Sequence, residues 1–231
     1  MKVAIMQPYF FPYIGYFQLI NAVDVFVIYD DVNYIKQGWV NRNRILINNK
    51  EHYFNLVLSS VSQNKKINEI FIDENIKWKE NLIKKMSFSY AKAPFFYEVF
   101  PIIKEIILNN QFNLSVFLTF SLKEICSYLE IKTKFLLSSE ININADAKAE
   151  DKIITICKKL GATNYINAIG GQELYNKTKF DENSLKLQFL KTNVIQYNQF
   201  NANFVPWLSI IDVLMFNEKE KIFKYLEEYQ L

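Results

Sequence analysis

Two short, continuously apolar segments separated by a helical pattern are the feature that most constrains the fold of this 231-residue chain. Segments 3–7 and 24–31 are predicted strands, and segment 13–22 between them is a predicted helix. Continuous apolar character is typical of parallel strands that are covered on both faces. A strand–helix–strand unit this compact predicts a right-handed parallel crossover.

The remainder of the chain continues the alternation of strands and helices. Its predicted elements are a hairpin within 45–58 that turns at 48–51, helices at 75–91, 94–109 and 114–129, a strand at 133–141, a helix at 150–160 that is closed by Gly161, strands at 164–169 and 185–190, and helices at 209–217 and 218–229. This order predicts an α/β protein with a three-layer, mainly parallel sheet of Rossmann-like or HUP-like type. We expect a single domain over 1–231, with a β-hairpin and a helical insertion at about 75–130.

Composition excludes several classes of protein. Half of the residues are hydrophobic, which is enough for a packed core. A formal net charge of +3 does not indicate a nucleic-acid-binding protein. Uninterrupted apolar runs stay far below the ~18 residues that a membrane span needs. The N-terminus carries one lysine before a strand pattern that Pro8 breaks, so a signal peptide is not expected.

Cysteine and histidine usage limits the chemistry further. Cys126 and Cys157 lie in predicted helices and form no CxxC pair, which argues against a disulfide framework and makes the cytoplasm the expected location. His52 is the one histidine, and it lies in the predicted hairpin. A histidine-rich metal site is therefore excluded. An exposed hairpin residue is the expected role of His52, so a general acid or base is expected to come from Asp, Glu, Lys or Tyr instead.

Residues that could bind a ligand, through polar side chains or through glycine backbone, follow three of the predicted strands. They are Gln7-Pro8, Asp30-Asp31 and Ile169-Gly170-Gly171. In open α/β sheets, ligands bind outside the carboxyl ends of the strands. The sequence therefore predicts that these three strand ends converge on one ligand site.

The segment QPYFFPYIGYF, residues 7–17, places aromatic rings and prolines where a short polar loop would be expected. Tyr9, Tyr13 and Tyr16 are predicted to line a slot for a flat ligand such as a base or a sugar ring. The alternative is that the rings pack the first helix onto the sheet. Gly15 would allow close approach of a ligand to the start of the helix, and the Gln7 amide is predicted to orient the substrate.

Segment 29–44 is the richest in polar groups. Asp30 and Asp31 are adjacent carboxylates that repel each other, so one of them is expected to have a raised pKa or to hold a cation. They are the candidate general base for an amine, together with Lys36 as a candidate catalytic residue. If a metal ion is bound, Asp31 is its expected ligand.

Basic and aromatic side chains follow these acids. Arg42 and Arg44 alternate, so an extended backbone points both to one side, and they could grip phosphate oxygens in fork geometry. Trp39 and Asn41 are further candidate substrate-binding residues, and Lys36 is a second candidate for the diphosphate. The alternative is a solvated loop with ordinary ion pairs.

Three later motifs give weaker signals. Gly170-Gly171 could let a phosphate reach backbone N–H groups, although a plain turn explains the same pair. Ser138-Ser139 ends a predicted strand with two hydroxyls. Ser209 is a predicted N-cap, and Asp212 at the N3 position is expected to be structural.

The sequence resembles the WbqC-like family. The resemblance is carried by 7–17, 29–32, the Gly38-Trp39-Val40-Asn41-Arg42-Asn43-Arg44 run, 93–96, 138–139 and 208–212. It implies a role in O-antigen or other surface-polysaccharide biosynthesis. Relatives carry a histidine in the helix that corresponds to 78–82, and this chain has none there.

A more distant similarity concerns the fold. The first strand, the proline-containing loop and Gly15-Tyr16-Phe17-Gln18-Leu19-Ile20 are similar to the start of HIGH-type nucleotidyltransferases and pantothenate synthetases. Tyr16 stands where their second histidine would be. The similarity implies a nucleotide slot without the histidine used in adenylyl transfer.

The resulting hypothesis is an enzyme that acts on a nucleotide-linked amino sugar and transfers an acyl or aminoacyl group to its amine. The alternatives are an ATP-using ligase or nucleotidyltransferase with Mg²⁺ on Asp31, and a non-catalytic nucleotide-sugar-binding protein. The cofactor is left open between Mg²⁺ and an acyl donor. A nucleotide-linked sugar is the expected partner, and the oligomeric state is left open, with a homo-oligomer among the alternatives.

Overall fold

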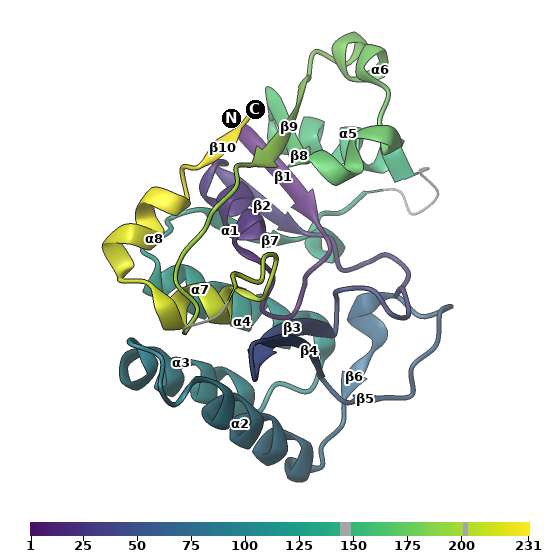
Figure 1. Cartoon of the computed structure of the whole chain (residues 1–231). Coiled ribbons are helices and arrows are strands. Elements are labelled where there is room, and N and C mark those ends of the chain that lie inside the picture. The colour runs from purple at the N-terminus through teal and green to yellow at the C-terminus, as the bar shows by residue number, and fades with distance from the viewer. Residues whose placement is uncertain (144–148, 201–202) are drawn as a thin grey trace.

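The chain folds around a six-stranded sheet in a computed structural model that describes residues 1–143, 149–200 and 203–231 (Figure 1). The strand order across the sheet is β10-β9-β8-β1-β2-β7. β9 and β10 pair antiparallel, and every other neighbouring pair is parallel. The predicted α/β class with a mainly parallel sheet is confirmed. The strands are β1 Lys2–Met6, β2 Val25–Ile28, β7 Lys134–Leu137, β8 Asn164–Ala168, β9 Lys186–Thr192 and β10 Tyr229–Gln230.

Alternate residues of the central strands enter two separate buried clusters. Ala4 of β1 lies in a cluster that includes helix α1, Ile14–Asn21, whereas Val3 and Ile5 lie in a cluster with helix α5, Ala149–Leu160. Side chains along a strand point alternately to its two faces, so both faces of the sheet are covered. This is why β1 and β2 are apolar without interruption.

The order of the strands reverses at β1, which has β2 on one side and β8 on the other. The chain passes from β1 through α1 to β2 and later to β7, and then continues with β8 and β9 beyond the other edge of β1. A crevice forms outside the carboxyl ends of the strands at such a reversal, because the connections leave in opposite directions. The site is expected between the ends of β1 and β8.

A hairpin and a group of helices lie between β2 and β7 in the sequence. The hairpin strands are β3 Arg42–Ile47 and β4 Lys50–Asn55, and they form a two-stranded sheet of their own. Asn48 and Asn49 turn the hairpin with φ angles of 49° and 61°, a conformation that asparagine tolerates. Helices α2 and α3 lie beside this hairpin and away from the main sheet (Figure 1). The bounds of the other elements of this region are β5 Leu58–Ser59, β6 Phe71–Ile72, α2 Ile76–Tyr90, α3 Phe96–Leu108 and α4 Leu114–Tyr128. The assignment of one domain with a helical insertion at about 75–130 stays a prediction.

The predicted elements of the second half are present, with bounds that differ by a few residues and with some additions. Helix α5 ends before Gly161, whose φ of 70° requires a glycine or a strained residue. Helix α7, Ile210–Phe216, is capped by Ser209 as predicted, and α8 spans Lys219–Tyr225. The sequence pattern did not indicate helix α6, Lys177–Glu182, or the two-residue strand β10. Elements of this length carry too few residues for a periodic signal.

Within the described parts of the chain, the structure contains no helix that is both long enough and apolar enough to span a membrane.

Candidate functional site

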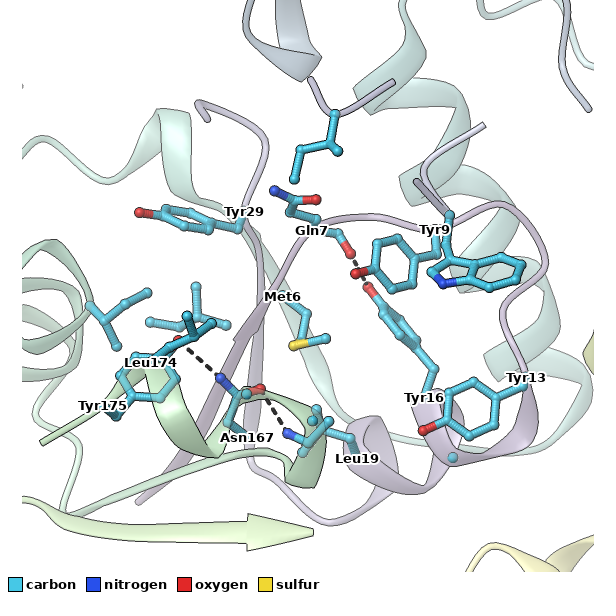
Figure 2. A pocket seen from close by; sticks show the side chains of 18 of the residues that line it. Met6, Gln7, Tyr9, Tyr13, Tyr16, Leu19, Tyr29, Asn167, Leu174 and Tyr175 are labelled. Carbon is cyan, nitrogen blue, oxygen red and sulfur yellow. Dashed lines mark hydrogen bonds between the residues drawn. The ribbon is translucent and has the colours of Figure 1, made fainter. Parts of the chain in front are cut away.

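A cavity of about 650 Å³ opens at the carboxyl ends of β1 and β8, where the strand order reverses. Figure 2 shows tyrosines on two sides of it: Tyr9, Tyr13 and Tyr16 on one side, Tyr29 and Tyr175 on the other. Met6 and Gln7, at the end of β1, lie between these two groups. The convergence of strand ends predicted from the sequence holds for β1 and β8. The described residues that line the cavity are Ile5, Met6, Gln7, Tyr9, Tyr13, Gly15, Tyr16, Leu19, Tyr29, Ile35, Trp39, Glu150, Ile153, Asn167, Ala168, Gly170, Gly171, Leu174 and Tyr175.

The aromatic loop between β1 and α1 is anchored by buried rings and by hydrogen bonds to its backbone. Phe10 and Phe11 are fully buried. Asn43 Nδ2 donates to the carbonyls of Phe10 and Phe11 at 3.2 and 2.9 Å, and Ser209 Oγ donates to the Phe11 carbonyl at 2.7 Å. Phe11 has a φ of 43°, which turns the chain sharply. The loop is aromatic and not polar because it is buried between the hairpin and the start of α7.

Tyr16 lies at the floor of the cavity and also belongs to the core. Its side chain is 2% exposed, its ring packs 5.4 Å from that of Phe26, and its hydroxyl donates to the Gln7 carbonyl at 2.8 Å. Both alternatives for the aromatic segment thus describe part of it: Tyr9 and Tyr13 are half-buried and line the cavity, while Tyr16 mainly supports them. Burial raises the pKa of all three hydroxyls, so they stay protonated at neutral pH.

We expect Tyr16→Phe to lower the free energy of unfolding by about 1 kcal/mol, since the Gln7 carbonyl loses its hydrogen bond. The affinity for a cavity ligand should change less than twofold, because the Tyr16 ring stays in place. Tyr9→Phe is the matched variant and should show the reverse, with unchanged stability and lower affinity. Chemical denaturation and titration calorimetry on both proteins separate the two roles. A large affinity loss in Tyr16→Phe would instead place its hydroxyl in the ligand site.

Gly15 is required for packing. A Cβ atom at this position would lie 2.3 Å from Tyr13 Cε2 and 2.4 Å from Thr192 Oγ1. The Tyr13 ring therefore lies directly over the first turn of α1. In this way α1 and β9 together fix the position of one wall of the cavity.

The end of β8 contributes a hydrogen-bonded asparagine. Asn167 Nδ2 donates to the hydroxyls of Tyr165 and Tyr175 at 3.0 and 2.9 Å, and its Oδ1 accepts from the Ala168 N–H at 2.7 Å. A Cβ at Gly171 would lie 3.3 Å from Asn167 Nδ2, whereas Gly170 has open space around it. The predicted pair Gly170-Gly171 lies in a 3-10 helix, Ile169–Leu174, and lines the cavity.

Asp30 does not line the cavity. Its carboxylate is buried, and it accepts hydrogen bonds from Ser115 Oγ at 2.9 Å, from Ser138 Oγ at 3.1 Å, and from Ser139 N and Oγ at 3.0 and 2.9 Å. The hydroxyls of Ser138-Ser139 thus serve to hold Asp30. This arrangement is structural, since the carboxylate joins the end of β2 to the end of β7 and to α4.

Asp31 is paired with a lysine from the opposite half of the sequence. Lys152 Nζ lies 2.6 Å from Asp31 Oδ2, and Ser138 Oγ donates to Oδ1. Partial burial acts to raise the pKa of Asp31, but the hydrogen bonds from Lys152 and Ser138 outweigh it and the pKa is lowered. The expected repulsion between adjacent carboxylates is relieved in this way. The positive charge beside Asp31 is the Lys152 side chain, which lies outside the lining of the cavity, and binding of a metal ion by Asp31 stays a prediction.

Of the predicted site residues Lys36, Trp39 and Asn41, which follow the two acids, only Trp39 lines the cavity. Lys36 is exposed and does not line the cavity, whereas Trp39 lines it and is 37% exposed. Asn41 is structural: its Oδ1 accepts from the Tyr34 hydroxyl at 2.7 Å, and its Nδ2 donates to the Leu56 carbonyl at 3.2 Å.

Arg42 and Arg44 point to one side, as their alternation predicts. Their guanidinium carbons lie 5.8 and 5.4 Å from the Trp39 ring centroid. The Arg42 guanidinium also lies over the Tyr53 ring, so it contacts both Trp39 and Tyr53. Arg44 pairs with Glu51 at 2.6 Å and donates to the Trp207 carbonyl at 3.1 Å. Several of the donors predicted to bind phosphate are therefore occupied within the protein.

A smaller hollow of about 180 Å³ joins the arginine side of the site to the cavity. Tyr9, Tyr13 and Trp39 line both spaces, whereas Arg44 and Trp207 line the hollow and not the cavity. One elongated ligand could therefore extend from the ends of β1 and β8 to Arg44.

The sequence analysis did not single out four cavity residues that carry polar groups: Tyr29, Glu150, Asn167 and Tyr175. Asn167 could have been found, because it is a polar residue at the end of a buried strand, as Gln7 is. Glu150 is the one carboxylate among the described lining residues. Its Oε1 accepts from the Asn176 N–H at 2.7 Å, and its Oε2 lies 3.2 Å from Lys179 Nζ. Over residues 1–143, 149–200 and 203–231, no group of three His, Cys, Asp or Glu side chains could hold a metal ion.

The fold and the cavity define an α/β protein with a cavity at the reversal of its strand order, which is where open α/β sheets bind ligands. The chain matches the model of the WbqC-like protein family over residues 7–224 and belongs to that family. It is 33% identical over 216 residues to "Uncharacterized protein Rv1507c" of Mycobacterium tuberculosis (strain ATCC 25618 / H37Rv), with 92% of each chain covered. No solved structure gives a significant match. The resemblance to the WbqC-like family is confirmed, and the similarity to HIGH-type nucleotidyltransferases stays a prediction.

Proposed function

We propose that this protein binds a nucleotide-linked amino sugar in the strand-end cavity and transfers an acyl or aminoacyl group to the sugar amine, as a step in surface-glycan biosynthesis. The observation that carries the proposal is the cavity of about 650 Å³ at the reversal of strand order, with tyrosines on two sides. This volume falls in the range of small-molecule sites.

The lining of the cavity suits a ring that carries hydroxyl groups. Tyr9 and Tyr13 offer ring faces and protonated hydroxyls, and Gln7 offers an amide at the end of β1. Aromatic faces cover apolar faces of a sugar or base, while neutral hydroxyls and amides donate and accept hydrogen bonds. In this proposal Asn167 holds Tyr175 in place and acts indirectly.

The diphosphate is proposed to extend toward Arg44. The hollow that Arg44 lines shares three residues with the cavity, so the two spaces lie side by side. Glu51, the partner of Arg44, is half-exposed and can exchange its hydrogen bond for water when a phosphate binds. Gly15, at the start of α1, also lines the cavity, and its N–H belongs to the first helical turn, whose donors are the ones that bind anions.

We expect Arg44→Lys to weaken binding of a nucleotide diphosphate sugar by about tenfold, because lysine cannot form the two-pronged contact. The free sugar, which lacks the diphosphate, should bind the two proteins equally. Titration calorimetry with both ligands measures the difference. Arg42→Lys is the matched control, since Arg42 does not line the hollow. Equal losses for both ligands would mean that Arg44 is structural.

Glu150 takes the role of general base in place of Asp30 and Asp31. A base must lie within hydrogen-bond reach of the proton that it removes, and neither aspartate lines the cavity. The Lys179 contact keeps the Glu150 carboxylate oriented without filling its hydrogen-bonding capacity.

Glu150→Gln is expected to lower turnover about 100-fold, within the range that general acid–base groups supply. Binding of the nucleotide sugar should stay within about threefold of wild type, because glutamine keeps the shape of the side chain. Release of free thiol from an acyl thioester, followed in the presence of the sugar, measures turnover. Asp31→Asn is the comparison variant. If it loses turnover while Glu150→Gln does not, the base is Asp31.

The second candidate is a non-catalytic nucleotide-sugar-binding protein. It is favoured by one observation: both acids predicted as catalytic are bound by serines or by Lys152 outside the cavity. A panel of UDP- and dTDP-linked sugars with and without a free amine, tested by thermal shift, distinguishes the candidates when it is combined with turnover. A ligand at about 100 times its Kd should stabilise the protein by about 2.7 kcal/mol. Binding without turnover across acyl donors would favour the second candidate, and no binding at all would refute both.

A further inference from the structure

A second hollow, of about 290 Å³, lies beside the cavity and shares the Tyr13 ring with it. Its walls come from the segment after β9, from 204–208 and from two helices, through Ile14 of α1 and Val213 of α7. Apolar side chains dominate these walls. None of the described residues that line the hollow is charged.

Trp207 stands at the rim of this hollow in an unusual conformation. It is 55% exposed, and its φ is 60°, a region that bulky side chains rarely adopt. The Arg44 hydrogen bond to its carbonyl holds the backbone, and its ring packs edge-on against Tyr13 with centroids 5.9 Å apart. Strained residues that the surrounding structure holds in place are concentrated at ligand clamps and active sites.

Val194, in the segment after β9, also lines the hollow. It is 84% exposed, an unusual state for an aliphatic side chain beside a hollow. An apolar ligand in the hollow would remove both Val194 and Trp207 from water, which favours binding. The hollow is therefore suited to an apolar chain.

We infer that this hollow binds the acyl chain of a thioester donor. The inference deepens the proposed function and rests on it for the identity of the acceptor. Tyr13 lines both spaces. An acyl chain that fills the hollow would therefore place its thioester carbonyl beside Tyr13, next to the proposed position of the sugar amine. A plain acyl group is favoured over an aminoacyl group, since an ammonium in a hollow whose described lining carries no charge would lose its hydration without gaining a carboxylate partner.

The transfer balances without a further reactant. The amine nitrogen attacks the thioester carbonyl carbon, a C–N bond forms and the C–S bond breaks. The proton that the amine loses passes by way of Glu150 to the departing sulfur, which leaves as a thiol. The products are one amide and one free thiol.

The test uses N-acetylcysteamine thioesters of acetate, butyrate and octanoate, titrated into the full-length protein. We expect affinity to rise with chain length, by at least about tenfold from acetyl to octanoyl, as burial of methylene groups predicts. Val194→Asp should remove at least about tenfold of the octanoyl affinity and leave nucleotide-sugar affinity unchanged. Val57→Asp is the control, because Val57 is also exposed, at 41%, and lies between β4 and β5, outside the hollow.

Three outcomes would change the interpretation of the hollow. Affinity that does not depend on chain length, or that Val194→Asp leaves unchanged, overturns the inference. So does a dimer that Val194→Asp dissociates in analytical ultracentrifugation, because the hollow is then a subunit interface. Octanoyl binding that needs Val194, without binding of any nucleotide sugar, supports the acyl site and refutes the proposed function.

Discussion

Replacing Asp30 by alanine is expected to lower the free energy of unfolding by about 4 kcal/mol, because several buried donors lose their acceptor together. Ser115 and Ser139 donate to this carboxylate, Ser139 through both its backbone N–H and its hydroxyl, and Ser138 Oγ shares its single hydrogen between Asp30 and Asp31. Each buried donor without a partner costs about 1–3 kcal/mol. For a chain of this length the melting temperature should fall by about 10 °C.

Asp181→Ala is the matched control, since Asp181 is an exposed aspartate of α6 and should change stability by less than about 0.5 kcal/mol. Urea denaturation of the three proteins gives the comparison. The opposite pattern, normal stability with complete loss of turnover in Asp30→Ala, would show that Asp30 is a catalytic residue and that its serines are not its structural partners.

The sequence was sufficient to predict the parts of the site that depend on one strand and its own loop. Gln7, Tyr9, Tyr13 and Gly15 all follow β1 directly, so the apolar strand, the rings and the glycine could be interpreted together. The alternation of Arg42 and Arg44 also predicted their common side correctly, because two-residue spacing has a fixed meaning in a strand.

The parts of the site that depend on strand order could not be predicted. Asn167 and Glu150 line the cavity because β8 is the neighbour of β1, and no local pattern encodes that pairing. The same holds for the ion pair of Asp31 with Lys152, which lie 121 positions apart. Two adjacent carboxylates at a strand end indicate chemistry when considered alone, but their partners come from the 3-10 turn after β7, from α4 and from α5.

Asp212 of α7 joins its own helix to α2 and to the segment that follows β9. Its Oδ2 accepts from the Tyr90 hydroxyl of α2 at 2.9 Å, and its Oδ1 accepts from the Tyr197 hydroxyl at 2.7 Å and from Gln199 Nε2 at 2.6 Å. Tyr197 also lines the second hollow, so Asp212 fixes one of its walls. The carboxyl group is fully buried, and burial raises its pKa from 3.8 to about 6, although the three hydrogen bonds oppose the shift.

A raised pKa in the folded state means that the native protein binds this proton more tightly than the unfolded chain does. The stability contribution is therefore present in full below the unfolded pKa of 3.8 and is lost as the pH rises through about 6. The shift corresponds to about 3 kcal/mol over the whole titration, and to about 2 kcal/mol between pH of about 4.5 and about 7.5. Tyr90 and Tyr197 do not add a charge in this interval, since burial raises the pKa of both hydroxyls.

Asp212→Asn cannot titrate, so the difference in unfolding free energy between wild type and Asp212→Asn isolates this one group. We expect that difference to fall by about 2 kcal/mol in favour of the variant as the pH rises from about 4.5 to about 7.5. Urea denaturation of both proteins across this range is the measurement. Asp24→Asn is the control because it removes a different aspartate and leaves Asp212 in place, so its difference from wild type should not show this trend. A difference that stays flat with pH would mean that Asp212 is ionised throughout and that its three donors compensate fully for burial. A rise instead of a fall would mean that the donors lower its pKa below that of the unfolded chain, and the wall formed by Tyr197 would then be held most firmly at neutral pH.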